Sequence, residues 1–212
     1  VLFTIYTDVL RAGSSKSTVI KFADDTVLLG YISDPGIDNE VYFDEVNRIS
    51  SVCSDNDLLL NPTKTHELIT TQRETPEVPT LMLGDVAIPQ SNNVKYLGVL
   101  VDNKLKFHDH MIDRLNTASK RMYVVRRFSA LGAESRLVTT LFRSFIESIL
   151  FYCITIFYSH IYSNDKKAIK SFFKDAKFYG AELDCDIDAR ISELGRTYSL
   201  RIFHDDNHFI HN

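Results

Sequence analysis

The sequence predicts an α+β fold in which a mixed amino-terminal part is followed by a helical part. As far as Asp102, short apolar runs separated by turn signals are typical of strands. Beyond Asp102, apolar residues recur every three or four positions, as they do in amphipathic helices. With 44% hydrophobic and 25% charged residues over 212 positions, the chain has the composition of a folded globular protein.

The clearest strand signal is the segment TVIKFADDTVLLG, which ends at Gly30. Apolar runs on both sides enclose Ala23-Asp24-Asp25, so we expect residues 18–31 to form an antiparallel hairpin with both aspartates at its turn. The segment VLFTIYTDVL before it reads as part of a helix that lacks a cap. Since the chain also starts at Val1 and not at Met, we expect a further part of the protein upstream.

Further elements follow from the same patterns. Asp38 is expected to cap a helix that ends near Asn56, because apolar residues follow it at helical spacing. DLLLNPTKTHELITT predicts two strands around an Asn-Pro turn, and TLMLGDVAIP predicts a hairpin that turns at Gly84-Asp85. NNVKYLGVLVD predicts another strand bounded by polar residues.

The helical part is expected to contain three helices and a tail. The second helix begins near Ala133, and the third runs from Ser163 to Gly180, where a glycine suits a left-handed cap. Residues 181–212 are expected to be irregular or frayed. The expected core positions are Met111, Leu115, Ala118, Met122 and Val125 in the first helix, and Leu137, Leu141, Phe145 and Ile149 in the second.

Charge is unevenly distributed along the chain. The formal net charge is −4, yet residues 104–143 contain nine Lys or Arg and three Asp or Glu. A basic stripe in an acidic chain indicates localised contact with a polyanion, although a solvated helix face would look the same. Eight of these nine are the candidates for such a contact, namely Lys104, Lys106, Lys120, Arg121, Arg126, Arg127, Arg136 and Arg143.

Cysteine usage and hydropathy bear on the environment of the protein. Cys53, Cys153 and Cys185 are widely spaced and odd in number, which favours a reducing, intracellular compartment and leaves nucleus or cytoplasm open. The longest apolar stretch, SILFYCITIFY, is too short to cross a bilayer, so we expect no membrane partner.

The two adjacent aspartates have two interpretations. Burying two ionised carboxylates is costly unless a cation neutralises them, and Mg²⁺ prefers carboxylate oxygens and water as ligands. A pair of such ions held about 3.5–4 Å apart is suited to nucleotidyl transfer. The plain alternative is a solvent-exposed Asp-Asp turn. For an Asp-Asp pair taken alone, the exposed turn is the expected interpretation. The metal site is favoured here because an aromatic-Ala-Asp-Asp sequence between two apolar strands, with a helix on either side, resembles the arrangement of a polymerase palm.

The ordered set of motifs resembles the reverse transcriptases of non-long-terminal-repeat retrotransposons, the LINE type. FADD resembles their aromatic-x-Asp-Asp box, LLLNPTKT the next motif, VKYLGVLVD the primer-grip hairpin, and LKFHDHMIDRLNTASKRMYVVRRF the start of the helical thumb. The resemblance implies a partial polymerase palm over residues 1–102 and a helical thumb over residues 103–180. It also implies an RNA template, a DNA primer and deoxynucleoside triphosphates as partners.

The resemblance assigns roles to particular residues. Asp24 and Asp25 match the metal-binding aspartates, for Mg²⁺ or Mn²⁺, and Phe22 matches the aromatic residue beside the primer terminus. Lys64 matches a lysine that would protonate or stabilise the pyrophosphate leaving group, unless it is an ordinary surface lysine. The primer-grip positions are Tyr96, Leu97 and Gly98, which could equally form a plain apolar strand. The thumb residues expected to contact the nucleic-acid backbone are Lys104, Lys106, Lys120, Arg121, Arg126 and Arg127.

Two features of the family's pattern are not found in the sequence. The family has a further metal-binding aspartate on an upstream strand, and a Gln-Gly-Ser turn before the opening helix. We therefore expect this chain to be inactive alone. The alternative is a catalytically dead remnant that binds nucleic acid at most. A zinc site in the tail sequence HDDNHFIHN is disfavoured, because it lacks cysteine and a helical pattern.

Overall fold

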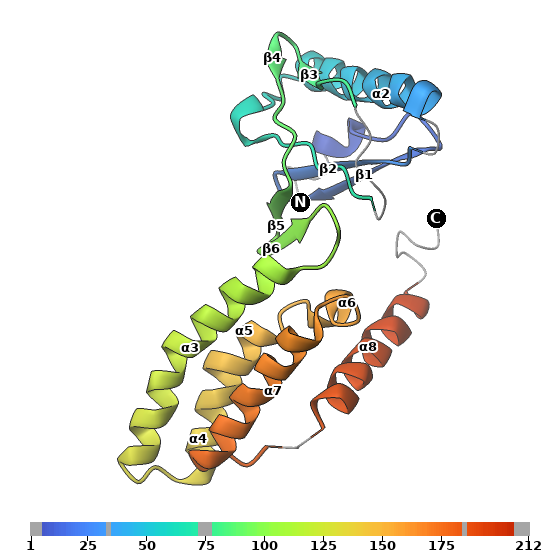
Figure 1. Ribbon diagram of the computed structural model, residues 1–212. Helices are drawn as coiled ribbons and strands as arrows, with labels where there is room; N and C mark the ends of the chain where they lie inside the picture. The colour runs from blue at the N-terminus through green and yellow to red at the C-terminus, as the bar shows by residue number, and fades with distance from the viewer. Residues whose placement is uncertain (1–5, 33–34, 72–77, 184–185, 206–212) are drawn as a thin grey trace. The chain divides into compact units, whose positions relative to one another are not determined.

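The structure is a computed structural model that describes residues 6–32, 35–71, 78–183 and 186–205. The chain divides into two compact units, residues 1–94 and 95–212. The first combines hairpins with one long helix, and the second is mainly helical (Figure 1). This mixture is the predicted α+β class. The division falls within strand β5, before Asp102.

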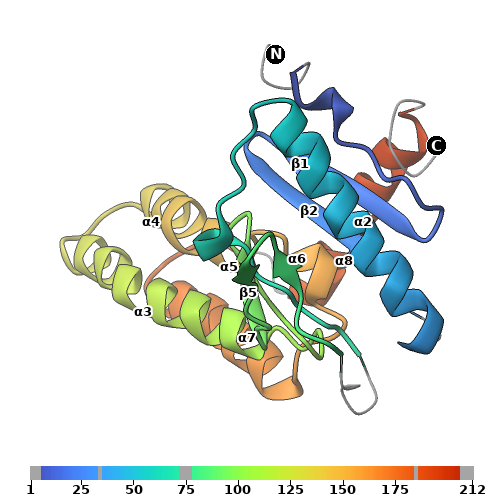
Figure 2. The same ribbon diagram turned by 90° about the horizontal axis from the view of Figure 1, so that it is seen from above.

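The predicted hairpin is confirmed and is the centre of the first unit. Strands β1 (Ser17–Phe22) and β2 (Asp25–Gly30) pair antiparallel, with Phe22 opposite Asp25. Helix α2 (Pro35–Asp55) lies along one face of the hairpin (Figure 2). Val19 and Leu28, which pair across the hairpin, pack against the buried cluster of Leu10, Ile49 and Cys53. The opening segment contributes the 3₁₀ turn η1 (Thr7–Val9), and residues 1–5 lie outside the described residues.

The prediction that Asp38 caps the helix is wrong, because α2 already begins at Pro35. Proline is favoured in the first turn of a helix, where its missing N–H costs nothing. Asp38 instead lies within that turn, where the helix dipole favours a carboxylate. It is buried and forms an ion pair with Lys16, which precedes β1.

The two strands predicted around Asn61-Pro62 are also wrong. Pro62–Lys64 form the 3₁₀ turn η2, and the Asn61 side chain caps it by accepting a hydrogen bond from the Thr63 N–H at 3.1 Å. Beyond the turn, Glu67 forms a single isolated bridge with Gln90. The hairpin of β3 (Met82–Leu83) and β4 (Val86–Ala87) is confirmed, with Gly84 at a φ of 60° in its turn.

The second unit begins with a hairpin and continues as a helix bundle. The segment predicted as one strand forms two, β5 (Asn93–Tyr96) and β6 (Val99–Asp102). Helix α3 packs against α4, α5 and α7, while α8 packs against α6. The helical elements are α3 (His108–Ala130), α4 (Ser135–Phe142), the π-helical turn η3 (Arg143–Glu147), α5 (Ser148–Leu150), α6 (Ile154–Phe157), α7 (Ser163–Phe178) and α8 (Ile187–Phe203).

The core prediction is right for α3 and wrong for the helix after it. In α3 the side chains of Met111, Ala118, Met122 and Val125 are buried, and Leu115 is partly buried. From α4 to α5 the buried apolar positions are Val138, Phe142, Ile146 and Leu150, one residue later than predicted. Of the predicted positions, Leu137 and Phe145 are exposed and Leu141 and Ile149 are half-buried.

The end of α7 is as predicted, but the tail is not. Gly180 has a φ of 92°, and the Ala181 N–H bonds to the Ala176 carbonyl at 2.9 Å, which closes a Schellman motif. The expectation of an irregular tail is wrong for Ile187–Phe203, because these residues form α8. The buried Ile187 and Ile191 join α8 to the core of the unit. No helix in the described part of the chain has the length and apolar character needed to cross a membrane.

Candidate metal-binding turn and nucleic-acid surface

The turn of the β1–β2 hairpin presents both predicted aspartates to solvent. Because Phe22 and Asp25 are paired, the turn consists of Ala23 and Asp24, and Asp25 is the first residue of β2. Phe22, Asp24 and Asp25 are all exposed, and the exposed fraction of Phe22 is 60%. Ala23 has a φ of 52°, a left-handed conformation that costs an alanine about 1–2 kcal/mol. Such strain concentrates at functional sites and in tight turns.

The turn fits a divalent cation as part of a ligand set. Its carboxylate oxygens are the ligands that Mg²⁺ prefers, but adjacent residues at a strand end direct their side chains differently, and both carboxylates are exposed, as in the plain Asp-Asp turn that the sequence also allowed. Within the described residues, no group of three or more His, Cys, Asp or Glu side chains could hold a metal ion. The turn therefore supplies two carboxylates, and further ligands would have to come from elsewhere.

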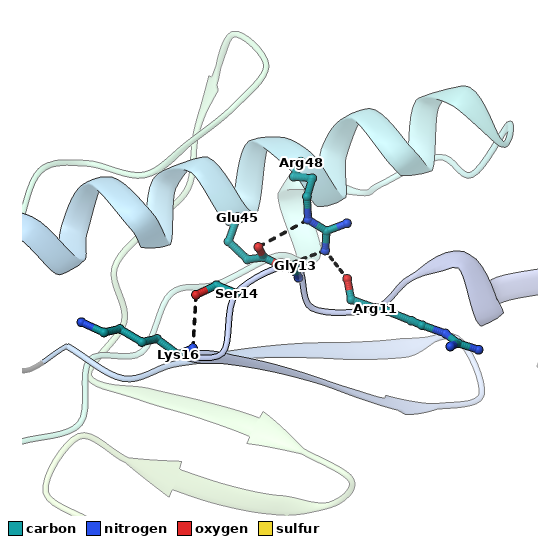
Figure 3. A network of polar contacts seen from close by, with 6 residues as sticks. All are labelled: Arg11, Gly13, Ser14, Lys16, Glu45 and Arg48. Atoms are coloured by element: carbon teal, nitrogen blue, oxygen red, sulfur yellow. Dashed lines mark hydrogen bonds and ion pairs between the residues drawn. The ribbon is translucent and has the colours of Figure 1, made fainter. Parts of the chain in front are cut away.

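Sequence reasoning missed a polar network that holds the chain segment leading into β1 against α2 (Figure 3). The Gly13 N–H donates to Glu45 Oε1 at 2.7 Å, and Arg48 bonds to the same carboxylate at 2.7 Å and to the Arg11 carbonyl. Nearby, the Lys16 N–H donates to Ser14 Oγ at 3.2 Å. Glu45 is buried, and the hydrogen bond from Arg48 lowers the pKa of its carboxyl.

The one feature of the sequence that could have indicated this network is the glycine at position 13. A Cβ atom at Gly13 would lie 2.6 Å from Arg48 Nε, so a larger residue would displace the guanidinium. On the other side of the loop, Lys21 Nζ of β1 donates to the Thr7 carbonyl at 2.7 Å. The contacts of Glu45 and Arg48 thus hold the segment before β1 against α2, and the contact of Lys21 joins the other end of β1 to η1.

Lys64 lies on η2, in the same unit as the aspartates. Its side chain is exposed, and its N–H bonds to the Asn61 carbonyl at 3.1 Å. Among the contacts of the described residues, none joins Lys64 to Asp24 or Asp25. Lys64 therefore faces solvent, and the structure shows no contact between it and the turn of the β1–β2 hairpin among the described residues.

The predicted primer-grip residues form the β5–β6 turn. Tyr96 ends β5, and the turn residues Leu97 and Gly98 have φ values of 46° and 83°. All three are half-buried. The predicted glycine therefore occupies a position whose backbone conformation suits it.

The predicted basic residues are all exposed, but they do not form one stripe. Helical geometry places Lys120 and Arg127 opposite the buried face of α3, while Arg121 and Arg126 lie on its two flanks. The Arg126 guanidinium lies 5.6 Å from the ring centroid of Tyr179. Arg143 is directed toward the buried Glu147, with Nε 4.0 Å from Oε2.

Asp102 organises the loop that carries Lys104 and Lys106. Its Oδ1 accepts hydrogen bonds from the N–H groups of Lys104 at 2.9 Å and Lys106 at 3.1 Å, and Oδ2 accepts from Phe107 at 2.5 Å. Leu105 and Phe107 both have a φ of 54°, so the loop is tightly coiled around this carboxylate. Both lysines are exposed as a result.

Two other features are separate from these residues. A hollow of about 360 Å³ in the first unit is lined by residues near Glu67 and Ile88, and none of the predicted site residues lines it. His204 is the C-cap residue that follows α8, with Nδ1 2.7 Å from the Leu200 carbonyl oxygen, while His208 and His211 lie outside the described residues.

Comparison with curated proteins found similarity to a transposon protein. The chain is 35% identical over 80 residues, 37% of its length, to a Drosophila melanogaster protein described as a probable RNA-directed DNA polymerase from transposon X-element. That match supports a polymerase-like origin. The chain spans about 8% of the length of this curated relative. No family model and no solved structure matches the chain.

Proposed function

We propose that the chain is part of a reverse transcriptase of the non-LTR retrotransposon type, with a partial palm over residues 1–102 and a thumb over residues 103–180. The observation that supports this most is the antiparallel β1–β2 hairpin, which places Asp24 in the turn and Asp25 at the first position of β2, between paired apolar strands. The partial match to a transposon polymerase supports the same origin. Bound Mg²⁺ or Mn²⁺ would activate the primer 3′-hydroxyl and stabilise the departing pyrophosphate.

Each of the proposed site residues has a separate role in this reaction. Asp24 and Asp25 hold the cation, and Phe22 packs beside the primer terminus. Lys64 stabilises the leaving pyrophosphate, and the β5–β6 turn contacts the primer. The phosphates of the RNA template and DNA primer are contacted, without reading of their sequence, by Lys104, Lys106, Lys120, Arg121, Arg126 and Arg127.

A second candidate function is nucleic-acid binding without catalysis. It is favoured by the lack of a third metal ligand among the described residues, together with the exposed basic residues of α3. The two candidate functions differ in whether Asp24 and Asp25 support primer extension once a further metal ligand is supplied.

Primer extension on an RNA template distinguishes them. We expect no extension by the 212-residue chain, because Mg²⁺ binds weakly where too few ligands converge. A longer chain that adds the upstream aspartate implied by the resemblance is expected to extend the primer. In that chain Asp24→Asn should abolish extension, while Asp85→Asn, in the β3–β4 turn, should leave it unchanged.

Lys64→Ala in the longer chain should slow extension by roughly 10²–10⁴-fold, the scale of a lost general acid. Undiminished extension by Asp24→Asn would contradict the metal assignment. An inactive longer chain that still binds primer–template duplex would favour the second candidate.

A further inference from the structure

The β5–β6 turn has a backbone conformation that its sequence does not stabilise alone. Two-residue turns with positive φ at both positions suit the twist of a hairpin, but Asn, Asp or Gly usually occupies the first position. Here that position is Leu97, at a φ of 46°. Only the second position, Gly98, adopts its φ of 83° without strain. A contact from outside the hairpin is needed to hold the turn in this form.

Tyr152 supplies that contact. Its hydroxyl donates a hydrogen bond to the Leu97 carbonyl oxygen at 2.6 Å. Its ring also lies against Gly98, since a Cβ atom added there would be 3.5 Å from the nearest ring carbon. These three residues all belong to the second unit.

Tyr152 is itself held in place by its neighbours. It lies in the connection between α5 and α6, and Phe151 and Cys153 on either side pack against the core of the unit. Cys153 has a φ of 56°, so the connection turns sharply at this point. The hydroxyl is therefore presented to the β5–β6 turn from the bundle.

We propose that Tyr152 is a positioning residue that holds the Leu97–Gly98 peptide in one orientation toward the primer strand. A peptide group is planar, so fixing the Leu97 carbonyl also fixes the direction of the Gly98 N–H. Backbone N–H groups are among the donors that contact sugar and phosphate oxygens of nucleic acids. The primer as ligand rests on the proposed function, whereas the hydrogen bond does not.

The test compares Tyr152→Phe with Tyr162→Phe in the full 212-residue chain. Tyr152 is 44% exposed and Tyr162 is 50% exposed, and the described residues show no hydrogen bond at the Tyr162 hydroxyl. Binding of a DNA-primer/RNA-template duplex is measured by fluorescence anisotropy at several salt concentrations. Amide hydrogen exchange at Gly98 and at the buried Met122 is measured without nucleic acid.

Tyr152→Phe is expected to weaken duplex binding by roughly 3- to 10-fold, the usual worth of one neutral hydrogen bond. The salt dependence of binding should be unchanged, because no phosphate contact is lost. Exchange should accelerate at Gly98 and stay the same at Met122. Tyr162→Phe should behave as the wild type in all three measurements.

A second variant, Gly98→Ala, controls for a general loss of stability of the second unit in Tyr152→Phe. Gly98→Ala strains the same turn while leaving the hydroxyl in place, so it should also weaken binding. The double variant should lose less than the sum, because both changes act on one turn. Wild-type affinity in Tyr152→Phe overturns the positioning role, even if exchange at Gly98 is faster. A wild-type chain that binds no duplex overturns the proposed function, and primer positioning with it, while exchange still reports whether the hydrogen bond holds the turn.

Discussion

His110 is buried with a partner for only one of its ring nitrogens. Its exposed fraction is 1%, and Nδ1 accepts a hydrogen bond from the Leu100 N–H at 3.3 Å. Nε2 is buried without a hydrogen-bond partner in the described part of the chain, and the Phe157 ring packs edge-on against the imidazole. Burial lowers the pKa of His110, as does the nearby Arg114, while Asp113 acts in the opposite direction.

The second unit should therefore lose stability on mild acidification. Since the pKa of His110 is lowered in the folded state, the unfolded chain binds the proton more readily below a pH of about 6.5. The free energy of unfolding should fall as the pH drops from 7 to 5. Urea unfolding of the wild type and of His110→Gln at several pH values measures this, and the variant should show a shallower fall.

A control variant and the opposite sign of the Glu147 titration separate His110 from the other titrating groups. The exposed His204→Gln should keep the wild-type pH dependence. Glu147 is buried, and burial raises the pKa of its carboxyl, so its protonation favours the folded state and opposes the effect of His110. Identical pH dependence in His110→Gln and the wild type would contradict the account of this residue.

At the scale of elements, the continuous helical segment formed by α4, η3 and α5 has a buried face one residue later than predicted, and its sequence explains the difference. Two series of apolar residues, one starting at Leu137 and the other at Val138, each recur every four positions along it. Periodicity alone therefore does not tell which series is buried. A spacing of four drifts around an α-helix of 3.6 residues per turn. The π-helical turn η3 carries more residues per turn, which helps to keep Phe142, Ile146 and Leu150 directed into the core.

A matched pair of substitutions tests this face. Phe142 is fully buried, whereas Phe145 is 42% exposed. Phe142→Ala should lower the free energy of unfolding by about 3–5 kcal/mol, the usual loss for a buried phenylalanine. Phe145→Ala should lower it by about 1 kcal/mol or less. Chemical denaturation of both variants measures the difference, and equal losses would contradict the assigned face.

Local turn chemistry could be read from the sequence, and tertiary contacts could not. The hairpins at Ala23-Asp24 and Gly84-Asp85 and the helix end at Gly180 follow from residues within a few positions. The segment around Asn61-Pro62 reads as strands but has only one isolated bridge, so propensity without a pairing partner misled the prediction. The network of Glu45 joins residues far apart in sequence, so Gly13 signals a loop in the sequence but not the residues of α2 that contact it.

At the scale of the whole molecule, the basic residues of the second unit should make duplex binding dependent on salt. Lys120 and Arg127 share the face of α3 opposite its core, so each is free to neutralise a phosphate. Changing either to alanine should reduce the slope of log affinity against log salt by about 1. Lys174→Ala, an exposed lysine on α7, should leave the slope unchanged.

Anisotropy titrations of a primer–template duplex at increasing salt concentrations measure these slopes. Slopes that stay at the wild-type value in both α3 variants would show that this face does not contact the nucleic acid. Equal reductions in Lys174→Ala would point to diffuse attraction by the whole unit.

We propose that the turn at Asp24 and Asp25 holds a divalent cation, and a manganese titration followed by NMR tests this most directly. Mn²⁺ should broaden the amide signals of residues 23–26 first, with a dissociation constant of roughly 1 mM or weaker, since two carboxylates leave most ligand positions to water. Asp24→Asn should abolish this selective broadening, and Asp85→Asn should not. Broadening that is no stronger at residues 23–26 than at the Gly84-Asp85 turn, or that survives in Asp24→Asn, would contradict the claim.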